Sequence, residues 1–278
     1  MSKTWFITGA GRGFGREFTI AALSRGDRVA ATARNTEALK DLVDTYGDAI
    51  VPLSLDVTDR AAVGTAVATA HERLGRLDIV VNNAGYGLFG TVEEITEQQL
   101  RDQLEVNLFG VFHVTQAVLP ILREQGSGHI VQISTVGGIA AFPTLGGYHA
   151  SKWALEGLSE SLAQEVAQFG ISVTLIEPGG FSTDWAGSSA VRAEPQPQYD
   201  ALRTEFIEQQ KGLPAEFTGE PAAAGPALLK LVDAEEPPLR VLFGLMPTIV
   251  VPGLYQTRLD TWKTWEPVSL EANGHDSD

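Results

Sequence analysis

The sequence contains no cysteine among its 278 residues. This absence excludes disulfide bonds, thiolate metal sites and cysteine nucleophiles, and no other metal site is predicted. Basic residues are scarce: 20 Lys and Arg stand against 35 Asp and Glu, giving a formal net charge of −15. A surface of that sign repels nucleic-acid phosphates and anionic lipids, so we expect neither a nucleic-acid partner nor a membrane partner.

Long uninterrupted apolar segments are missing as well. The longest uncharged stretches, between Glu124 and Lys152 and from Val241 to Thr257, are broken by glycines or prolines and are not expected to span a membrane. The chain starts Met1-Ser2-Lys3 and runs directly into a strand-like segment, which is not the pattern of a signal peptide. We therefore expect a cytoplasmic protein.

Short apolar runs alternate regularly with segments of helical periodicity. Most of the runs are continuously apolar, as in strands buried on both faces of a parallel sheet. The predicted strands are Thr4–Thr8, Arg28–Thr32, Ile50–Leu55, Leu77–Val81, His129–Ile133, Ile171–Ile176 and Leu239–Phe243. The predicted helices lie near 14–25, 36–45, 59–74, 97–124 and 148–168. This order predicts an α/β fold: a Rossmann-like, doubly wound parallel sheet of about seven strands.

The pattern changes after the sixth predicted strand. Residues 179–238 contain several prolines and two further helical stretches, near 198–211 and 221–233. An insertion of that length is too long for a simple connection, so we predict a helical lid over the carboxyl edge of the sheet, where ligands bind. We expect a single domain over residues 1–265, followed by an acidic, mobile tail over 266–278.

A glycine-rich loop follows the first predicted strand and leads directly into a helical pattern. Glycines at such a turn let the backbone approach a pyrophosphate, whose charge the helix N-terminus stabilises. The alternative is an ordinary glycine-rich turn. The candidate cofactor ligands in this loop are Gly9, Arg12, Gly13, Phe14 and Gly15.

The end of the second predicted strand indicates which dinucleotide is bound. Folds that prefer NAD usually place an acidic residue there to bind the ribose 2′-hydroxyl. Here the strand ends in Thr32-Ala33-Arg34, and no acid occurs before Glu37. Arg34 and Arg12 suit a 2′-phosphate, because guanidinium groups form planar, charge-assisted hydrogen bonds. The sequence therefore predicts NADP(H), with NAD(H) and two coincidental surface arginines as the alternative.

Two further strand ends carry candidate cofactor contacts. Asp56 and Val57 follow the third strand, and Asn83, Ala84 and Gly85 follow the fourth. The small residues would let the backbone lie against a flat ligand, and Asp56 could accept a hydrogen bond from an exocyclic amine. Ordinary turn chemistry at a strand exit is the alternative for both.

Tyr148 and Lys152 form the candidate catalytic pair. Four residues apart on a helix, they share one face and can point into one site. A cation beside a phenol favours the phenolate, which makes an acid or base usable near neutral pH. Ser134 and Thr135 end the fifth predicted strand, fourteen and thirteen residues earlier, and supply a hydroxyl group.

These motifs occur in one order along the chain. They are Thr8-Gly-x-x-x-Gly-x-Gly15, Asn82-Asn-Ala-Gly85, a hydroxyl residue before Tyr148-x-x-x-Lys152, and Pro178-Gly179-x-x-x-Thr183. The ordered set closely resembles the single-domain short-chain dehydrogenases/reductases, over residues 4 to about 245.

The resemblance implies a role for each matching residue. Tyr148 would be the acid/base, and Lys152 would lower its pKa and bind the nicotinamide ribose. Asn107 would support a proton-relay water. Pro178, Gly179 and Thr183 would lie along the nicotinamide.

One position departs from the family pattern. The family usually has a serine thirteen residues before the tyrosine, and this chain has Thr135 there. We take Thr135 as the residue that polarises the substrate carbonyl and Ser134 as the alternative. Phe181 and Trp185, just beyond the cofactor segment, are candidate walls of the substrate pocket.

The resemblance implies an NADP(H)-dependent oxidoreductase that reduces ketones or aldehydes to alcohols, or catalyses the reverse reaction. Its partner would be a small-molecule carbonyl or alcohol. The alternatives are an NAD-preferring alcohol or steroid-type dehydrogenase and a nucleotide-binding regulator without catalysis. The family commonly pairs the helices near 97–124 and 148–168 between subunits, which implies a homodimer or homotetramer.

Overall fold

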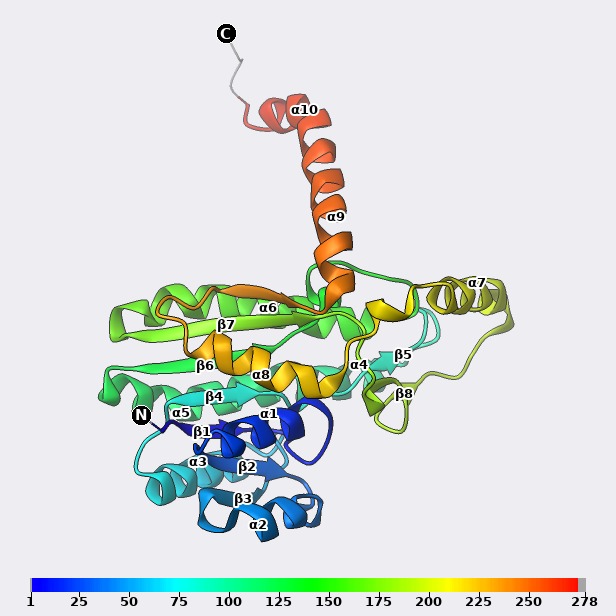
Figure 1. The fold of residues 1–278 in the computed structure, drawn as a ribbon. Helices are drawn as coiled ribbons and strands as arrows, with labels where there is room; N and C mark the ends of the chain where they lie inside the picture. The colour runs from blue at the N-terminus through cyan, green and yellow to red at the C-terminus, as the bar shows by residue number, and fades with distance from the viewer. Residues whose placement is uncertain (1, 275–278) are drawn as a thin grey trace.

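The computed structural model describes residues 2–274. Within that range, seven parallel strands form one sheet in the order β3-β2-β1-β4-β6-β7-β9 (Figure 1). The strands are β1 Thr4–Ile7, β2 Arg28–Ala33, β3 Ile50–Ser54, β4 Ile79–Asn82, β6 Gly128–Ile133, β7 Ile171–Pro178 and β9 Arg240–Phe243. This order confirms the predicted doubly wound, Rossmann-like sheet. A separate pair, β5 Leu88–Phe89 and β8 Val191–Arg192, lies beyond the carboxyl edge.

Helices connect the strands and cover both faces of the sheet. They are α1 Gly13–Ser24, α2 Lys40–Tyr46, α3 Arg60–Leu74, α4 Glu97–Leu104, α5 Val111–Gln125, α6 Gly146–Val166, α7 Asp200–Lys211, α8 Pro221–Val232, α9 Leu245–Thr264 and α10 Glu266–Glu271. The start of α3 is fixed by Asp59, whose side chain accepts hydrogen bonds from the backbone N–H groups of Ala61 and Ala62. A capping box between Thr96 and Gln99 starts α4.

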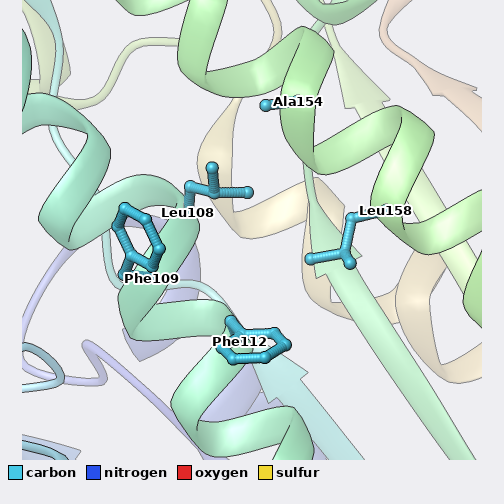
Figure 2. Close-up of a pocket in the computed structure, with 5 residues that line it drawn as sticks. All are labelled: Leu108, Phe109, Phe112, Ala154 and Leu158. Carbon is cyan, nitrogen blue, oxygen red and sulfur yellow. The ribbon is translucent and has the colours of Figure 1, made fainter.

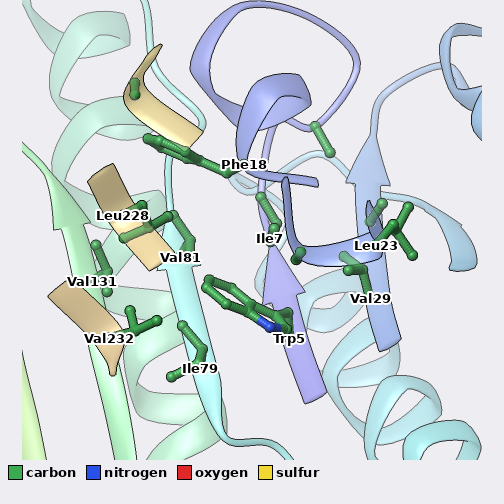
Figure 3. Close-up of a cluster of buried hydrophobic side chains, with 14 of the residues drawn as sticks. Trp5, Ile7, Phe18, Leu23, Val29, Ile79, Val81, Val131, Leu228 and Val232 are labelled. Atoms are coloured by element: carbon green, nitrogen blue, oxygen red, sulfur yellow. The ribbon is translucent and has the colours of Figure 1, made fainter. Parts of the chain in front are cut away.

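The hydrophobic core lies on both faces of the sheet because side chains alternate along each strand. Trp5 and Ile7 of β1 pack with α1 and α8 on one face, as Figure 3 shows, whereas Phe6 packs with α3 and α5 on the other. The Trp5 indole N–H is satisfied in this core, because it donates a 2.8 Å hydrogen bond to the Asp27 carboxylate.

The second half of the predicted lid belongs to the hydrophobic core and does not cover the site. The insertion before the last strand is present and contains α7 and α8, but Ala224 and Leu228 of α8 are buried in the cluster with Trp5 and Val81. A Cβ atom on Gly225 would lie 2.8 Å from the Ala21 Cβ of α1, so the two helices are in close contact. Only residues 179–220 therefore extend beyond the carboxyl edge of the sheet.

Leu228→Ala should lower the free energy of unfolding by about 2–5 kcal/mol, because it leaves a cavity in the core. Urea denaturation measures this loss. Lys230→Ala, on the exposed side of α8, is the matched control and should change stability by no more than about 0.5 kcal/mol. Equal effects of the two substitutions would contradict the core assignment of α8.

The chain after β9 differs from expectation. No element is predicted after the last predicted strand, yet α9 spans Leu245–Thr264 and projects away from the body (Figure 1). Pro247 lies in the first turn, where a missing N–H removes no helical hydrogen bond. Residues 266–271, predicted to belong to a mobile tail, form α10, with Pro267 in its first turn. Residues 275–278 of the predicted tail lie outside the described residues.

The segment Glu97–Gln125 is long and apolar enough to cross a membrane, by length and composition alone. Here it is divided into α4, a π-helical turn over Glu105–Gly110, and α5. Val114, Val118 and Leu122 of α5 are fully buried against the sheet. These contacts are typical of a core helix in an α/β fold.

Candidate active site

The glycine loop between β1 and α1 is packed tightly against the end of β4. A Cβ atom on Gly9, which has φ of +66°, would lie 2.9 Å from the Ala84 Cα. The Asn83 side-chain amide donates hydrogen bonds to the carbonyl oxygens of Thr8 (2.9 Å) and Gly9 (3.1 Å). The Thr8 hydroxyl in turn accepts from the backbone N–H groups of Asn83 and Ala84. These contacts bring two of the predicted cofactor segments together.

Gly13, at the first position of α1, fits a phosphate ligand. Its φ is +54°, and a Cβ atom there would meet no protein atom within 4 Å. The helix is preceded by Arg12, whose side chain caps none of the free N–H groups of the first turn. An open, uncapped helix N-terminus is the environment that binds a pyrophosphate.

The side chain of Phe14 packs against two other aromatic rings. Its ring stacks on Phe18 and meets Phe181 edge-to-face, with ring centroids 5.6 and 4.8 Å apart respectively. A direct contact between Phe14 and a cofactor stays a prediction. The structure instead shows Phe14 joining the glycine loop to the segment that follows β7.

The two arginines predicted to bind a 2′-phosphate lie on adjacent backbone segments. A Cβ atom on Gly11 would lie 3.6 Å from the Ala33 Cβ. Arg12 and Arg34 directly follow these two residues in the sequence, so the two arginines start from neighbouring points of the backbone. The Arg12 guanidinium lies 3.4 Å from the Asp184 carboxylate, in an ion pair that is about half exposed. Arg12 therefore links the glycine loop to the segment that follows β7.

Asp56 makes the turn that follows β3. Its Oδ1 accepts hydrogen bonds from the backbone N–H (3.0 Å) and the hydroxyl (2.8 Å) of Thr58. These bonds, and the charge of Arg34, hold the pKa of Asp56 below its usual value. Val57 is buried against Gly110, where a Cβ atom would lie 2.6 Å from Val57 Cγ2. The structure thus gives both residues a local packing role, and their cofactor contacts stay predictions.

Tyr148 and Lys152 lie buried on α6, at the carboxyl edge of the sheet. The Lys152 ammonium donates a 2.7 Å hydrogen bond to the Ile133 carbonyl oxygen at the end of β6. Burial lowers the pKa of Lys152 to about 8, while the nearby charge of Glu156 raises it. Burial also raises the pKa of Tyr148, and a hydrogen bond with the Thr135 side chain lowers it in part. Tyr148 is therefore a protonated phenol at neutral pH and can donate a proton.

The geometry favours Thr135 over Ser134 as the hydroxyl that faces Tyr148. The two residues are adjacent in extended backbone, so their side chains point to opposite sides. The Ser134 hydroxyl lies 2.5 Å from where a Cβ atom on Gly138 would be, on the side of Glu156. The Thr135 hydroxyl interacts with Tyr148 and lies 3.4 Å from the Pro178 carbonyl oxygen.

Asn107 lies in the π-helical turn between α4 and α5 and is fully buried. Its amide nitrogen donates to the Tyr86 carbonyl oxygen and the Ser151 hydroxyl, both at 3.1 Å. A Cβ atom on Gly85 would lie 3.0 Å from Asn107 Oδ1 and 3.8 Å from Lys152 Nζ. Asn107 and Lys152 therefore converge on Gly85, where only a glycine fits without a shift.

Ser151 and the π-helical turn are the features of the site that the sequence analysis did not identify. The Ser151 hydroxyl donates a 2.7 Å hydrogen bond to the Tyr148 carbonyl oxygen and so connects Asn107 to the catalytic helix. π-Helical turns are rare and are frequent at functional sites. No residue pattern in the segment Glu105–Gly110 signals the turn, because its signature is a hydrogen-bonding spacing.

The segment after β7 covers the catalytic pair. β7 ends at Pro178, and Gly179 is packed so closely that a Cβ atom there would lie 2.7 Å from Pro247 Cδ. The Thr183 hydroxyl accepts a hydrogen bond from the Trp185 backbone N–H. The Trp185 ring lies 4.9 Å from the Tyr148 ring, between centroids, and 5.2 Å from Phe89 of β5. Trp185 is therefore a wall of the site, directly beside Tyr148.

This arrangement combines three chemical capabilities in one site. Tyr148 offers a proton, Lys152 a buried cation, and Thr135 a hydroxyl that can hydrogen-bond an oxygen atom. The open N-terminus of α1 and the loop glycines offer a cradle for a phosphate group. Within residues 2–274, no group of three or more His, Asp and Glu side chains is placed to hold a metal ion.

Comparisons with known proteins agree with this geometry. A sequence model of the short chain dehydrogenase family matches residues 3–193. "Oxidoreductase BOA17" of Botryotinia fuckeliana is 46% identical over 245 residues, which cover 88% of this chain and 89% of that protein. A "3-ketodihydrosphingosine reductase" of Bacteroides thetaiotaomicron is 35% identical over 266 residues, covering 95% and 93% of the two chains.

Solved structures show the same fold. A short-chain dehydrogenase from Streptomyces avermitilis has a TM-score of 0.90 and 41% identity, with 98% of both chains covered. Two similar structures contain nicotinamide nucleotides. An alcohol dehydrogenase of Thermococcus sibiricus, complexed with 5-hydroxy-NADP, has a TM-score of 0.71 and 28% identity over 88% of this chain and 97% of that one. A Burkholderia phymatum short-chain dehydrogenase/reductase, in complex with NAD, has a TM-score of 0.77 and 27% identity, covering 90% of this chain and 91% of that one.

The family match covers more than half of the chain, and the curated relatives align over nearly the whole of it. The ordered motifs that the sequence presents therefore reflect common descent rather than coincidence. This protein belongs to the short-chain dehydrogenase family and is an oxidoreductase.

Proposed function

We propose that this oxidoreductase uses NADP(H) to reduce the carbonyl group of a small ketone or aldehyde, or to catalyse the reverse reaction. The observation that carries this proposal is the buried Tyr148 phenol, which lies beside both the Thr135 hydroxyl and the indole of Trp185. A carbonyl group bound beside Trp185 would meet two donors: the Tyr148 phenol, which can donate a proton, and the Thr135 hydroxyl, which can donate a hydrogen bond. The name of the Bacteroides thetaiotaomicron relative, a reductase of a 3-keto compound, supports a ketone substrate.

The residues of the glycine loop fit a nicotinamide dinucleotide. Gly13 presents open space at the N-terminus of α1, and Gly9 and Gly15 allow close approach of the loop to β4. Both neighbouring structures with bound nicotinamide nucleotides share this fold. When bound, the cofactor supplies or accepts a hydride ion.

The protein's own residues handle the proton. Tyr148 donates its phenolic proton to the carbonyl oxygen while Thr135 hydrogen-bonds that oxygen. Lys152, held at the Ile133 carbonyl by its 2.7 Å hydrogen bond, carries a positive charge at pH 7 because its pKa is about 8. That charge stabilises the phenolate as it forms. Asn107 and Ser151 fix the backbone around Tyr86 and Tyr148, which keeps the phenol in place.

A panel of ketones, aldehydes, steroids and secondary alcohols, each with both cofactors, tests the proposal. We expect oxidation of NADPH that depends on the carbonyl compound. The decrease in absorbance of the reduced nicotinamide measures this oxidation. Cofactor binding without turnover of any carbonyl or alcohol would support the non-catalytic regulator instead. Higher efficiency with NADH would support the NAD-preferring dehydrogenase, an alternative that the Burkholderia phymatum complex keeps open.

The oligomer proposed is a homodimer or homotetramer that forms in part through α5 and α6. An apolar groove of about 310 Å³ lies between helix α6 and the π-helical turn that leads into α5. Figure 2 shows the residues that line it: Leu108, Phe109, Phe112, Ala154 and Leu158. Phe109, one of the lining residues, is 44% exposed. An exposed apolar surface of this kind usually marks a protein interface.

Leu158→Arg should halve the native mass, because it places a charge in this groove and an unpaired charge is costly to bury. Light scattering at micromolar concentration measures the mass. Gln164→Arg, at an exposed position of the same helix, is the matched control and should leave the mass unchanged. A wild-type protein that is monomeric would contradict the proposed interface.

A further inference from the structure

Lys152 is a buried cation whose hydrogen-bond partner in the structure is uncharged. Its ammonium donates to the Ile133 carbonyl oxygen at the end of β6, 2.7 Å away, and the residue is only 6% exposed. Burial favours the neutral amine, because an unpaired charge is costly away from water. The proposed proton chemistry needs the charged form at neutral pH, so a counter-charge is required near this face of α6.

Glu156 supplies that counter-charge. It follows Lys152 by four residues on α6, so the two side chains share one face of the helix. Both reach the end of β6, where Lys152 binds Ile133 and Glu156 lies beside the next residue, Ser134. Among the described residues, Glu156 is the carboxylate whose charge raises the pKa of Lys152.

An arginine on the edge strand β9 holds Glu156 in place. Arg240 donates a 3.0 Å hydrogen bond from its Nε to Glu156 Oε2, and one of its terminal nitrogens donates to Glu160 Oε2 at 2.8 Å. Burial raises the pKa of Glu156, and the neighbouring hydroxyl and cations lower it in part. A charge-assisted hydrogen bond of this kind favours the ionised carboxylate. Arg240 therefore stabilises the negative charge that faces Lys152.

A second buried carboxyl, Glu177 of β7, leaves the negative charge to Glu156. Glu177 lies 3.4 Å from Arg240 Nε, a longer contact than that of Glu156. Burial and the charge of Glu156 raise the pKa of Glu177 to about 7. Two buried carboxyls beside one guanidinium do not both ionise readily. Glu156 has the shorter contact with Arg240 and also faces Lys152, so it is the member of the pair that stays ionised.

We propose that Glu156 is a positioning residue of the reaction: it keeps the proton on Lys152, and Arg240 keeps Glu156 charged for that role. The inference rests on the proposed proton chemistry and adds a third side chain to the catalytic face of α6. Tyr148, Lys152 and Glu156 follow one another at intervals of four residues and are all buried. The groups around the Glu156 carboxyl are Lys152 and Glu160 of α6, Arg240 of β9, Glu177 of β7 and Ser134 at the end of β6.

The direct test is the pKa of Lys152 in the cofactor-free protein, measured by NMR of isotope-labelled lysine side chains. Lys152→Ala identifies the signal. Glu156→Gln keeps the size of the side chain and one acceptor oxygen. In this variant we expect the pKa of Lys152 to fall by about one pH unit or more, because an opposite charge at close range is lost.

Glu177→Gln is the matched control. It removes the other buried carboxyl beside the same guanidinium, so it tests whether any such substitution disturbs the site. The control should not lower the pKa of Lys152. Circular dichroism checks that each variant is folded.

The consequence for catalysis is a change in pH dependence. Lys152 loses its proton as pH rises through its pKa, so Glu156→Gln should move the basic limb of kcat/KM for carbonyl reduction to lower pH. At about pH 9 the variant should be about tenfold less efficient than the wild type, and at about pH 6 the two should agree within about twofold. A structural defect would lower the efficiency equally at both pH values.

Three outcomes would overturn the proposal. They are an unchanged pKa of Lys152 in Glu156→Gln, an equal decrease of that pKa in Glu177→Gln, and an equal loss of efficiency at both pH values. A wild-type protein without any carbonyl turnover would contradict the proposed reaction instead. In that case the NMR titration, which uses no substrate, still decides whether Glu156 keeps the proton on Lys152.

Discussion

Tyr148→Phe should lower kcat by about 10²–10⁴-fold, the range typical of general acid–base catalysis. The substitution removes the phenolic proton and keeps the ring, so the contact with Trp185 is retained. Cofactor affinity should stay within a few-fold of the wild-type value, because the glycine loop and the N-terminus of α1 are untouched. Steady-state kinetics and a fluorescence titration with the cofactor measure the two quantities separately.

Tyr46→Phe is the matched control for this experiment. It removes a phenol whose hydroxyl is hydrogen-bonded to Ser24 at the far end of α1, 2.8 Å away. Its turnover should equal that of the wild type. If Tyr148→Phe instead keeps about a tenth or more of wild-type turnover, the proton comes from another group and the proposed mechanism is wrong.

The wild-type protein should prefer NADPH over NADH by at least about tenfold in kcat/KM. A charge-assisted hydrogen bond from Arg34 or Arg12 to a 2′-phosphate contributes ~1.5–3 kcal/mol, and each ~1.4 kcal/mol is a factor of ten. Ala33, which is buried at the end of β2, presents no charge that would repel the phosphate. Because both guanidiniums are at the surface, the preference should decrease as ionic strength rises.

Ala33→Asp/Arg34→Leu should reverse this preference. The new carboxylate would accept a hydrogen bond from the free 2′-hydroxyl and repel the phosphate. Arg60→Gln, which removes an exposed guanidinium from α3, is the control and should leave the ratio unchanged. Equal efficiency of the wild type with both cofactors would show that neither arginine reaches the phosphate.

The sheet was predictable because its strands are continuously apolar and its glycine turns are local signals. Trp5, Phe6 and Ile7 read as a buried strand from the sequence, and they are fully buried in the structure on alternating faces. The helix start at Asp59 was likewise predictable, since a capping side chain acts within three residues of its own position.

The errors arise where long-range packing decides the outcome. Leu228 of α8 belongs to the core because α8 contacts α1, about two hundred residues earlier in the sequence, which no local pattern reveals. The choice between Ser134 and Thr135 required the backbone direction at the end of β6. Pro247 and Pro252 argue only against a membrane-spanning helix, and no helix is predicted there, whereas α9 accommodates both prolines within its length.

The π-helical turn at Glu105–Gly110 makes the length of this helix a part of the active site. A π turn holds more residues than an α-helical turn, and each residue of an α-helix rotates the chain by about 100°. The turn therefore lets Asn107 face Gly85 and Ser151 while Val114 and Val118 still face the sheet. Deleting a single residue here would change no charge and remove no catalytic group. It would rotate α4 relative to α5. Either Asn107 would then turn away from Gly85 and Ser151, or Val114 and Val118 would turn away from the sheet.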